Sequence, residues 1–201
     1  MSRSREVPVI PVHTLLEAYG EGRFPMAHAD GELYWHDPDP RAVFDLGTVR
    51  PNARLARAMR QMDLHITRDV AFPAVVEACA ERPETWIDAR IQATYVQLHR
   101  AGHAHSVEVW SADGPGRRQL VGGIYGVALG GAFFGESMFH RVPNAGKVAF
   151  HALAEHLRSA GFTLFDSQYL NPFTASLGAV EVPRARFLRM LAAAKQVPAC
   201  F

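Results

Sequence analysis

The chain has 201 residues, a formal net charge of +1 and 48% hydrophobic residues. That length fits one large domain or a domain with a small addition, and the near-neutral charge excludes a strong overall field that would attract nucleic acid. Two distant cysteines, Cys79 and Cys200, exclude a disulfide scaffold and are expected to be reduced thiols. No apolar run approaches the ~20 residues of a membrane span, and the charged first residues do not resemble a secretory signal. We therefore expect a cytoplasmic protein with no membrane partner.

The first forty residues predict a small subdomain. Residues 14–17, Thr-Leu-Leu-Glu, have the form of a capping box that opens a short helix, which Gly20 and Gly22 end. A turn at Asp30 and Gly31 precedes a short strand at 33–35. The run Asp-Pro-Asp-Pro at 37–40 fits neither a helix interior nor a central strand. We therefore expect a subdomain at 1–40 and the main domain at 41–201.

The main domain is predicted to combine helices with an antiparallel sheet. Asn52 is a favourable helix N-cap, and the last helix begins with a proline at a tolerated position. Helices are expected at 52–62, 72–81, 88–100, 144–159 and 183–194, and strands at 64–68, 104–110, 120–129, 132–136 and 163–166, with a turn at 112–116. Helices followed by consecutive strands, and then by helix, strand and helix, indicate an α+β fold.

Several unusual segments follow one another along the chain. The most unusual is Gly-Glu-Ser-Met-Phe at 135–139, with Asn144, Ala145 and Lys147 shortly after it. The others are Gly-Arg-Phe-Pro-Met at 22–26, Trp-His-Asp-Pro-Asp-Pro-Arg at 35–41, Gly-Gly-Ile-Tyr-Gly-Val at 122–127, Phe-Asp-Ser-Gln at 165–168 and Ala-Ser-Leu-Gly-Ala at 175–179. With these segments in their order along the chain, the sequence from about Leu15 to Leu191 resembles the leucyl/phenylalanyl-tRNA–protein transferases.

The resemblance implies an acetyltransferase-like (GNAT-like) fold for the main domain and a transfer reaction that needs no cofactor. The donor would be an aminoacyl-tRNA carrying Leu, Phe or Met. The acceptor would be the α-amine of a protein that begins with Lys or Arg, which is thereby marked for degradation. We expect the enzyme to act as a monomer. An α-amine with a pKa of ~7.7–8.0 is partly uncharged at neutral pH, so catalysis needs mainly positioning and removal of a proton.

Asp166 and Gln168 are two residues apart at a strand end, so their side chains are predicted to lie on the same side. A carboxylate in a dry cleft needs partners, and a neighbouring amide can relay its hydrogen bond. By resemblance this pair is the catalytic centre, in which Gln168 contacts the incoming amine and Asp166 polarises it. The sequence leaves open whether either residue acts as a base or only positions the amine. The alternative is that Asp166 caps the following turn.

Glu136 is the third predicted catalytic residue, and its neighbour Gly135 allows close approach of a ligand or backbone. The carboxylate has three candidate partners: the cationic side chain of the acceptor, the attacking amine, and the ribose hydroxyls. The sequence does not choose among them. A purely structural alternative is a salt bridge to Arg141.

By resemblance, apolar side chains line the pocket for the transferred amino acid: Ile124, Phe133, Phe150, Leu153 and Leu157. Without the resemblance, such a stripe at helical spacing would indicate core. An apolar cavity distinguishes a single methylene by only ~1–3 kcal/mol, but branching at Cβ adds a clash near the ester. The size of Phe150 predicts a narrow pocket and a preference for Leu over Phe.

The tRNA is expected to be held in two places. The terminal adenine needs a stacking surface, which the resemblance assigns to Trp86, with Met26 where some relatives have a second tryptophan. A phosphate track is predicted from arginines at spacings of four, three and three residues, which set most of them along one side of the helix that begins at Asn52: Arg50, Arg54, Arg57 and Arg60. The alternative is an ordinary solvated helix face.

Two other functions are compatible with parts of the sequence. An acyl-CoA-dependent N-acetyltransferase would share the fold, but the chain lacks the glycine-rich turn that meets pyrophosphate at a helix N-terminus. A non-catalytic RNA-binding module has no use for Asp166 and Gln168 beside an apolar pocket. His103 and His105 have no carboxylate or cysteine at ligand spacing, so no metal site is expected.

Overall fold

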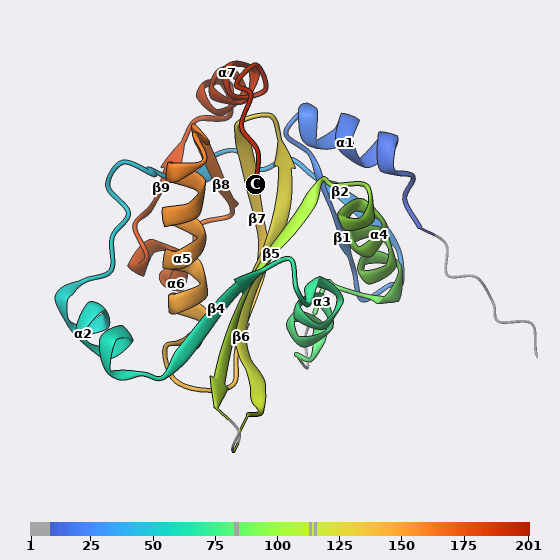
Figure 1. The fold of residues 1–201 in the computed structure, drawn as a ribbon. Helices are drawn as coiled ribbons and strands as arrows, with labels where there is room; N and C mark the ends of the chain where they lie inside the picture. The colour runs from blue at the N-terminus through green and yellow to red at the C-terminus, as the bar shows by residue number, and fades with distance from the viewer. Residues whose placement is uncertain (1–8, 83–84, 113, 115) are drawn as a thin grey trace, which may run out of the picture.

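The computed structural model describes residues 9–82, 85–112, 114 and 116–201, so the predicted turn at 112–116 lies partly outside the described residues. The centre of the fold is a seven-stranded sheet in the order β4-β5-β6-β7-β8-β3-β9 (Figure 1). Its strands are β3 (Arg41–Phe44), β4 (Leu64–Arg68), β5 (Ala104–Ala112), β6 (Arg118–Leu129), β7 (Ala132–His140), β8 (Leu164–Gln168) and β9 (Ala179–Val182). Only β7 and β8 are parallel neighbours; the other pairs are antiparallel.

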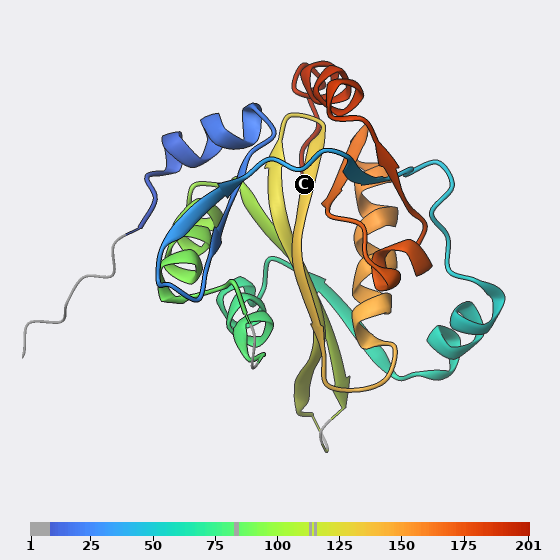
Figure 2. The same ribbon diagram turned by 180° about the vertical axis from the view of Figure 1, so that it is seen from behind.

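Helices cover both faces of this sheet, as Figures 1 and 2 show together. Because strand side chains alternate between faces, Phe133 packs on the side of α5, whereas Phe134 packs in the separate cluster formed with α3 and α4. The main-domain helices are α2 (Ala53–Gln61), α3 (Phe72–Ala80), α4 (Ala89–Arg100), α5 (Ala145–Ser159), α6 (Pro172–Ser176) and α7 (Arg184–Ala194). The α+β prediction is confirmed. None of the described helices is long and apolar enough to cross a bilayer.

The N-terminal region forms its own two-stranded sheet, β1 (Phe24–Ala27) with β2 (Leu33–His36), preceded by α1 (Val12–Gly20). The predicted capping box is wrong: α1 begins at Val12, two residues before Thr14, and its N-cap is Pro11 with φ −57°. A proline at this place loses no helical hydrogen bond, because the first N–H groups of a helix lack intrahelical acceptors. The predicted helix end is confirmed, since Gly22 takes φ +82° just after α1.

Sequence patterns locate the long elements of the main domain and the short strands β4 and β8, but miss other short elements. Asn52 caps α2 as predicted, with its side chain accepting from the N–H of Leu55 at 2.9 Å. The last helix begins one residue later than predicted, with Pro183 as its N-cap. The elements without a prediction are β1, β3, β9 and α6, each of four or five residues. In so few residues a hydrophobic period locates some elements, such as β4 and β8, and not others.

The parallel pair β7 and β8 opens along its length. The two strands pair over only three positions, and the last is Phe134 with Asp166. Beyond it β7 continues to His140, whereas β8 ends at Gln168, whose φ of +64° turns the chain away. Glu136 and Gln168 each lie two residues past the last pair. Their side chains therefore face each other across the opening.

Candidate active site

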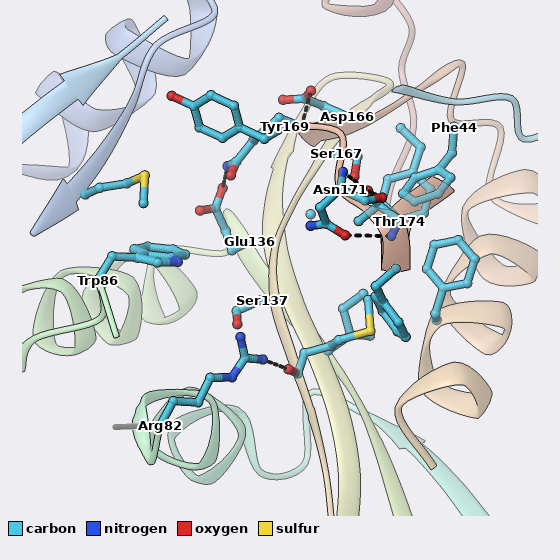
Figure 3. A pocket seen from close by; sticks show the side chains of 18 of the residues that line it. Phe44, Arg82, Trp86, Glu136, Ser137, Asp166, Ser167, Tyr169, Asn171 and Thr174 are labelled. Atoms are coloured by element: carbon cyan, nitrogen blue, oxygen red, sulfur yellow. Dashed lines mark hydrogen bonds between the residues drawn. The ribbon is translucent and has the colours of Figure 1, made fainter. Parts of the chain in front are cut away.

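A cavity of about 420 Å³ occupies the opening between β7 and β8 (Figure 3). Arg82 and Trp86 lie at one side of it, and Phe44, Asn171 and Thr174 lie at the other. Its lining combines an apolar part with the polar side chains near the ends of the two strands: Met26, Phe44, Arg82, Trp86, Ile124, Gly135, Glu136, Ser137, Met138, His140, Phe150, Phe165, Asp166, Ser167, Gln168, Tyr169, Asn171, Phe173 and Thr174. All three predicted catalytic residues are thus brought to one cavity.

Asp166 is fully buried and is paired with Arg41 of β3, which is 1% exposed. Nε of Arg41 donates to Oδ1 at 2.9 Å, and Nη2 donates to Oδ2 at 2.6 Å. The third guanidinium nitrogen donates to the carbonyl of Gly22 at 2.7 Å. The rings of Phe24 and Phe187 lie 4.9 and 4.5 Å from the guanidinium carbon. A bidentate pair of this kind is rigid and satisfies both buried charges.

The predicted relay from Asp166 to the Gln168 side chain is wrong. Oδ1 of Asp166 accepts from the backbone N–H of Gln168 at 3.0 Å, while the Gln168 amide donates to Oε1 of Glu136 at 2.9 Å. The expected alternation of side chains along the strand fails here because the backbone of Gln168 is in the left-handed conformation and the register of β3 against β8 shifts at this point. Asp166 therefore fixes the backbone that carries Gln168.

Glu136 is held by three side chains. The Tyr19 hydroxyl donates to Oε1 at 2.6 Å, the Tyr95 hydroxyl lies 2.9 Å from Oε2, and the two phenol oxygens are 2.6 Å apart. Burial raises the pKa of Glu136 from 4.5 to about 7, although the bonds from Tyr19, Gln168 and Tyr95 oppose the rise. The alternative salt bridge is excluded, because Arg141 pairs with Glu81 at 3.0 Å.

The sequence reasoning missed the three residues that support this centre: Tyr19, Arg41 and Tyr95. Arg41 ends one of the unusual segments, and this position marks it as a candidate. An arginine that follows Asp39-Pro40 is nevertheless expected at the surface, and the sequence does not indicate that it is buried. Tyr95 lies on the buried stripe of α4, where helical spacing indicates core. Its phenol oxygen, rather than its ring, makes the contact that matters. Only the tertiary fold brings α1, α4, β3 and β7 together.

The apolar part of the cavity differs from the predicted lining. Ile124 and Phe150 line it as expected. In the described structure Phe133, Leu153 and Leu157 are instead core residues behind the wall, each at most 1% exposed. Their places in the lining are taken by Phe44, Met138 and Phe165. The stripe on α5 faces mainly the sheet, so its residues at helical spacing form core, as such stripes usually do.

Trp86 and Met26 both line the cavity, as the predicted adenine site requires. The backbone N–H of Ala27 donates to the carbonyl of Trp86 at 3.1 Å, which ties the β1–β2 hairpin to the segment before α4. Tyr169 and Phe173 are exposed at the rim, at 44% and 40%. Both ends of the opening therefore present aromatic surface.

A second, polar cavity of about 430 Å³ lies beside α2 and receives two of the four predicted arginines, Arg50 and Arg54. Lys147 and His151 of α5 also line it. Arg57 and Arg60 are exposed on α2 outside its lining. Nζ of Lys147 lies 6.0 Å from the ring centroid of Phe173, a residue of the first cavity. The two cavities thus meet at the N-terminal end of α5.

Comparison with known proteins agrees with this geometry. The family model described as leucyl/phenylalanyl-tRNA protein transferase matches residues 43–192, and the model of its N-terminal domain matches residues 10–39. A relative named leucyl/phenylalanyl-tRNA–protein transferase from Gloeobacter violaceus is 50% identical over 93% of this chain and 95% of its own length. A relative of the same name from Ruegeria pomeroyi is 48% identical over 90% of this chain and 85% of its own length. Another from Chlorobium luteolum is 46% identical over 96% of this chain and 100% of its own length. The chain therefore belongs to the leucyl/phenylalanyl-tRNA–protein transferase family of aminoacyltransferases.

Proposed function

We propose that the protein transfers Leu, Phe or Met from aminoacyl-tRNA to the α-amine of proteins that begin with Lys or Arg, and so creates an N-end-rule degradation signal. It does so in the cytoplasm, as a monomer and without a cofactor. The observation that carries this proposal is the opening between β7 and β8, where an apolar cavity, an indole surface and the Glu136–Gln168 pair meet.

The donor fits this opening in one orientation. The aminoacyl side chain occupies the apolar part, bounded by Phe44, Ile124 and Phe150, and the terminal adenine stacks between Trp86 and Met26. The ester that joins them then lies near the strand ends, beside Gln168. A wall of two rigid rings and a branched side chain limits the depth available to the transferred side chain, which disfavours branching close to the ester.

Catalysis in this arrangement is mainly positioning. The Arg41–Asp166 pair holds the backbone of Gln168, and the Gln168 side chain directs the attacking amine toward the ester carbonyl. An amide oxygen is a weak base, so its contribution is orientation of a neutral amine. As the new C–N bond forms and the ester C–O bond breaks, the proton lost by the amine passes to the departing ribose oxygen, which leaves as a hydroxyl. Asp166 acts through Gln168 and is a positioning residue.

The tRNA phosphates lie along the second cavity and the exposed side of α2. Arg50 and Arg54 line that cavity, where the carbonyls of Leu46 and Val49 hold the Arg50 guanidinium, while Lys147 adds a cation from α5. Arg57 and Arg60 extend the positive surface outward. Contacts of this kind bind without regard to sequence and weaken as salt rises. Their position near α5 places the track next to the end of the aminoacyl cavity.

The assay combines the purified protein with tRNA charged with labelled Leu and a peptide that begins with Arg. The expected product is the same peptide extended by one Leu at its N-terminus, identified by mass spectrometry. A matched peptide with an acetylated N-terminus should give no product, because its nitrogen is not nucleophilic. Absence of product from the Arg peptide, together with acetylation of it by acetyl-CoA, would overturn the proposed activity in favour of N-acetyl transfer.

A further inference from the structure

The Tyr19–Tyr95–Glu136 cluster contains three oxygen–oxygen contacts, but its two phenol protons can bridge only two of them when Glu136 is ionised. Three oxygen–oxygen contacts close a ring: Tyr19 to Oε1 at 2.6 Å, Tyr95 to Oε2 at 2.9 Å, and Tyr19 to Tyr95 at 2.6 Å. Each phenol has one proton, and an ionised carboxylate has none. With Glu136 ionised, two protons serve three contacts, so one pair of oxygens would face each other unbridged inside the protein, which is unfavourable.

A proton on Glu136 completes the ring. Oε2–H then donates to Tyr95, Tyr95 donates to Tyr19, and Tyr19 donates to Oε1, with every contact bridged by one proton. Oε1 also accepts from the Gln168 amide at 2.9 Å, which uses its second lone pair. Glu136 is 9% exposed and the phenols are fully buried, so little water can substitute for a missing bridge.

Glu136 is also the cavity carboxyl that lacks a cation. Asp166 is neutralised by Arg41, whereas none of the ion pairs found among the described residues includes Glu136. The charged or titratable groups around Glu136 and its tyrosines come from every element packed there: Tyr19, Cys79, Arg82, Tyr95, Tyr125 and Asp166. Arg82 donates to the carbonyl of Met138 instead.

We propose that burial and the closed ring of three oxygen contacts keep Glu136 protonated in the empty enzyme, although each phenol donor by itself favours the carboxylate, and that Glu136 exchanges this proton for a cationic group of a substrate. The inference deepens the proposed function and depends on it for the nature of the cation, which is an organic ammonium or guanidinium. The exchange balances: the neutral carboxyl loses one proton to solvent, and the resulting carboxylate pairs with the incoming cation. Two sources supply such a cation, the α-ammonium of the aminoacyl group and the N-terminal residue of the acceptor.

Infrared spectroscopy of the ligand-free protein tests the ring without any need for transferase activity. At pH ~6 a protonated carboxyl band should be present that Glu136→Gln removes, and it should disappear as the pH passes the pKa of about 7. Tyr19→Phe and Tyr95→Phe should each lower the midpoint of this titration, because an open ring no longer leaves two oxygens unbridged when Glu136 is ionised. Tyr125→Phe is the matched control, since its buried hydroxyl has no hydrogen-bond partner in the described structure. A Glu136 that is already ionised at pH ~6, or a midpoint that both ring variants leave unchanged or raise, would overturn the proposal.

Calorimetry in buffers of different ionisation enthalpy tests the exchange and identifies the cation. The first experiment uses an amide-linked leucyl adenosine analogue, and its control is the same analogue without the α-amine, which lacks the ammonium group. The second uses a peptide that begins with Arg, and its control is a peptide that begins with citrulline, which lacks the guanidinium charge. At pH ~6 the ligand that supplies the cation should release about one proton on binding, because a group with a pKa near 7 is then mostly protonated. Glu136→Gln should release none. Binding of both cationic ligands without proton release, or equal release from the variant, would contradict the exchange.

Discussion

The Arg41–Asp166 pair gives the clearest test of how the active centre is supported. Replacing Arg41 by Met keeps much of the side-chain volume but leaves the Asp166 carboxylate buried without its cation. Two charge-assisted hydrogen bonds, at 2.9 and 2.6 Å, are lost together with the bond to the Gly22 carbonyl. Breaking a buried pair from one side costs about 3–5 kcal/mol, because the remaining charge is not compensated. For a domain of this size that corresponds to a fall in Tm of about 6–20 °C.

Thermal and urea unfolding of the variant measure this cost. The matched control is Arg23→Met, since Arg23 forms an exposed pair with Glu21 and should lose at most about 1 kcal/mol. The double variant Arg41→Met with Asp166→Leu should recover most of the loss, because replacing a whole buried pair by apolar residues is often neutral. A single variant within about 1 kcal/mol of the parent, or a double variant no more stable than the single one, would refute the reasoning.

Three further predictions concern stability and substrates. Glu136→Gln should be more stable than the parent at alkaline pH. The pKa of Glu136 is about 7 in the folded protein and 4.5 for a free carboxyl, so its contribution to stability is full at low pH and is lost as the pH rises through 7. Denaturation curves should show this loss as about 3 kcal/mol in the free energy of unfolding of the parent. Trp86→Ala should raise the KM for aminoacyl-tRNA about 5- to 100-fold at nearly constant kcat, as steady-state kinetics would show, because stacking on a base is worth ~1–3 kcal/mol; an effect on kcat alone would assign Trp86 another role. Phe150→Leu should deepen the apolar cavity and shift competition between Leu-tRNA and Phe-tRNA toward Phe; an unchanged ratio would show that Phe44 and Phe165 set the depth.

The sequence predicts the main elements and the catalytic segments but not how they are supported. Period and capping locate α2 and α5 because both are long enough to show a pattern. They miss β3, whose four residues are all buried and include Arg41. The segment Phe-Asp-Ser-Gln marks Asp166 and Gln168 as unusual, yet strand alternation predicts the wrong contact between them, because the left-handed turn at Gln168 depends on tertiary packing.

The pocket lining shows the same limit. Helical spacing on α5 identifies which residues are buried, and Phe150, Leu153 and Leu157 are all buried. It does not show which buried residue reaches the cavity and which packs on the sheet. That distinction depends on where β7 and β8 separate, and Phe44 reaches the cavity from a strand that no sequence pattern revealed. The sequence does not reveal the roles of Tyr19 and Tyr95 for a related reason: their rings pack in the core, and only their hydroxyl oxygens contact Glu136.

Single-turnover transfer by Gln168→Ala tests the central claim, that the opening between β7 and β8 is the reaction centre, most directly. The alanine removes the amide that bonds Glu136, while the apolar cavity and Trp86 remain to bind the donor. We expect a fall of at least tenfold in the rate of Leu transfer to an Arg-starting peptide, a loss of about 1.4 kcal/mol or more of transition-state stabilisation, with unchanged affinity for Leu-tRNA. Transfer at the parental rate by a folded Gln168→Ala protein would place the chemistry elsewhere.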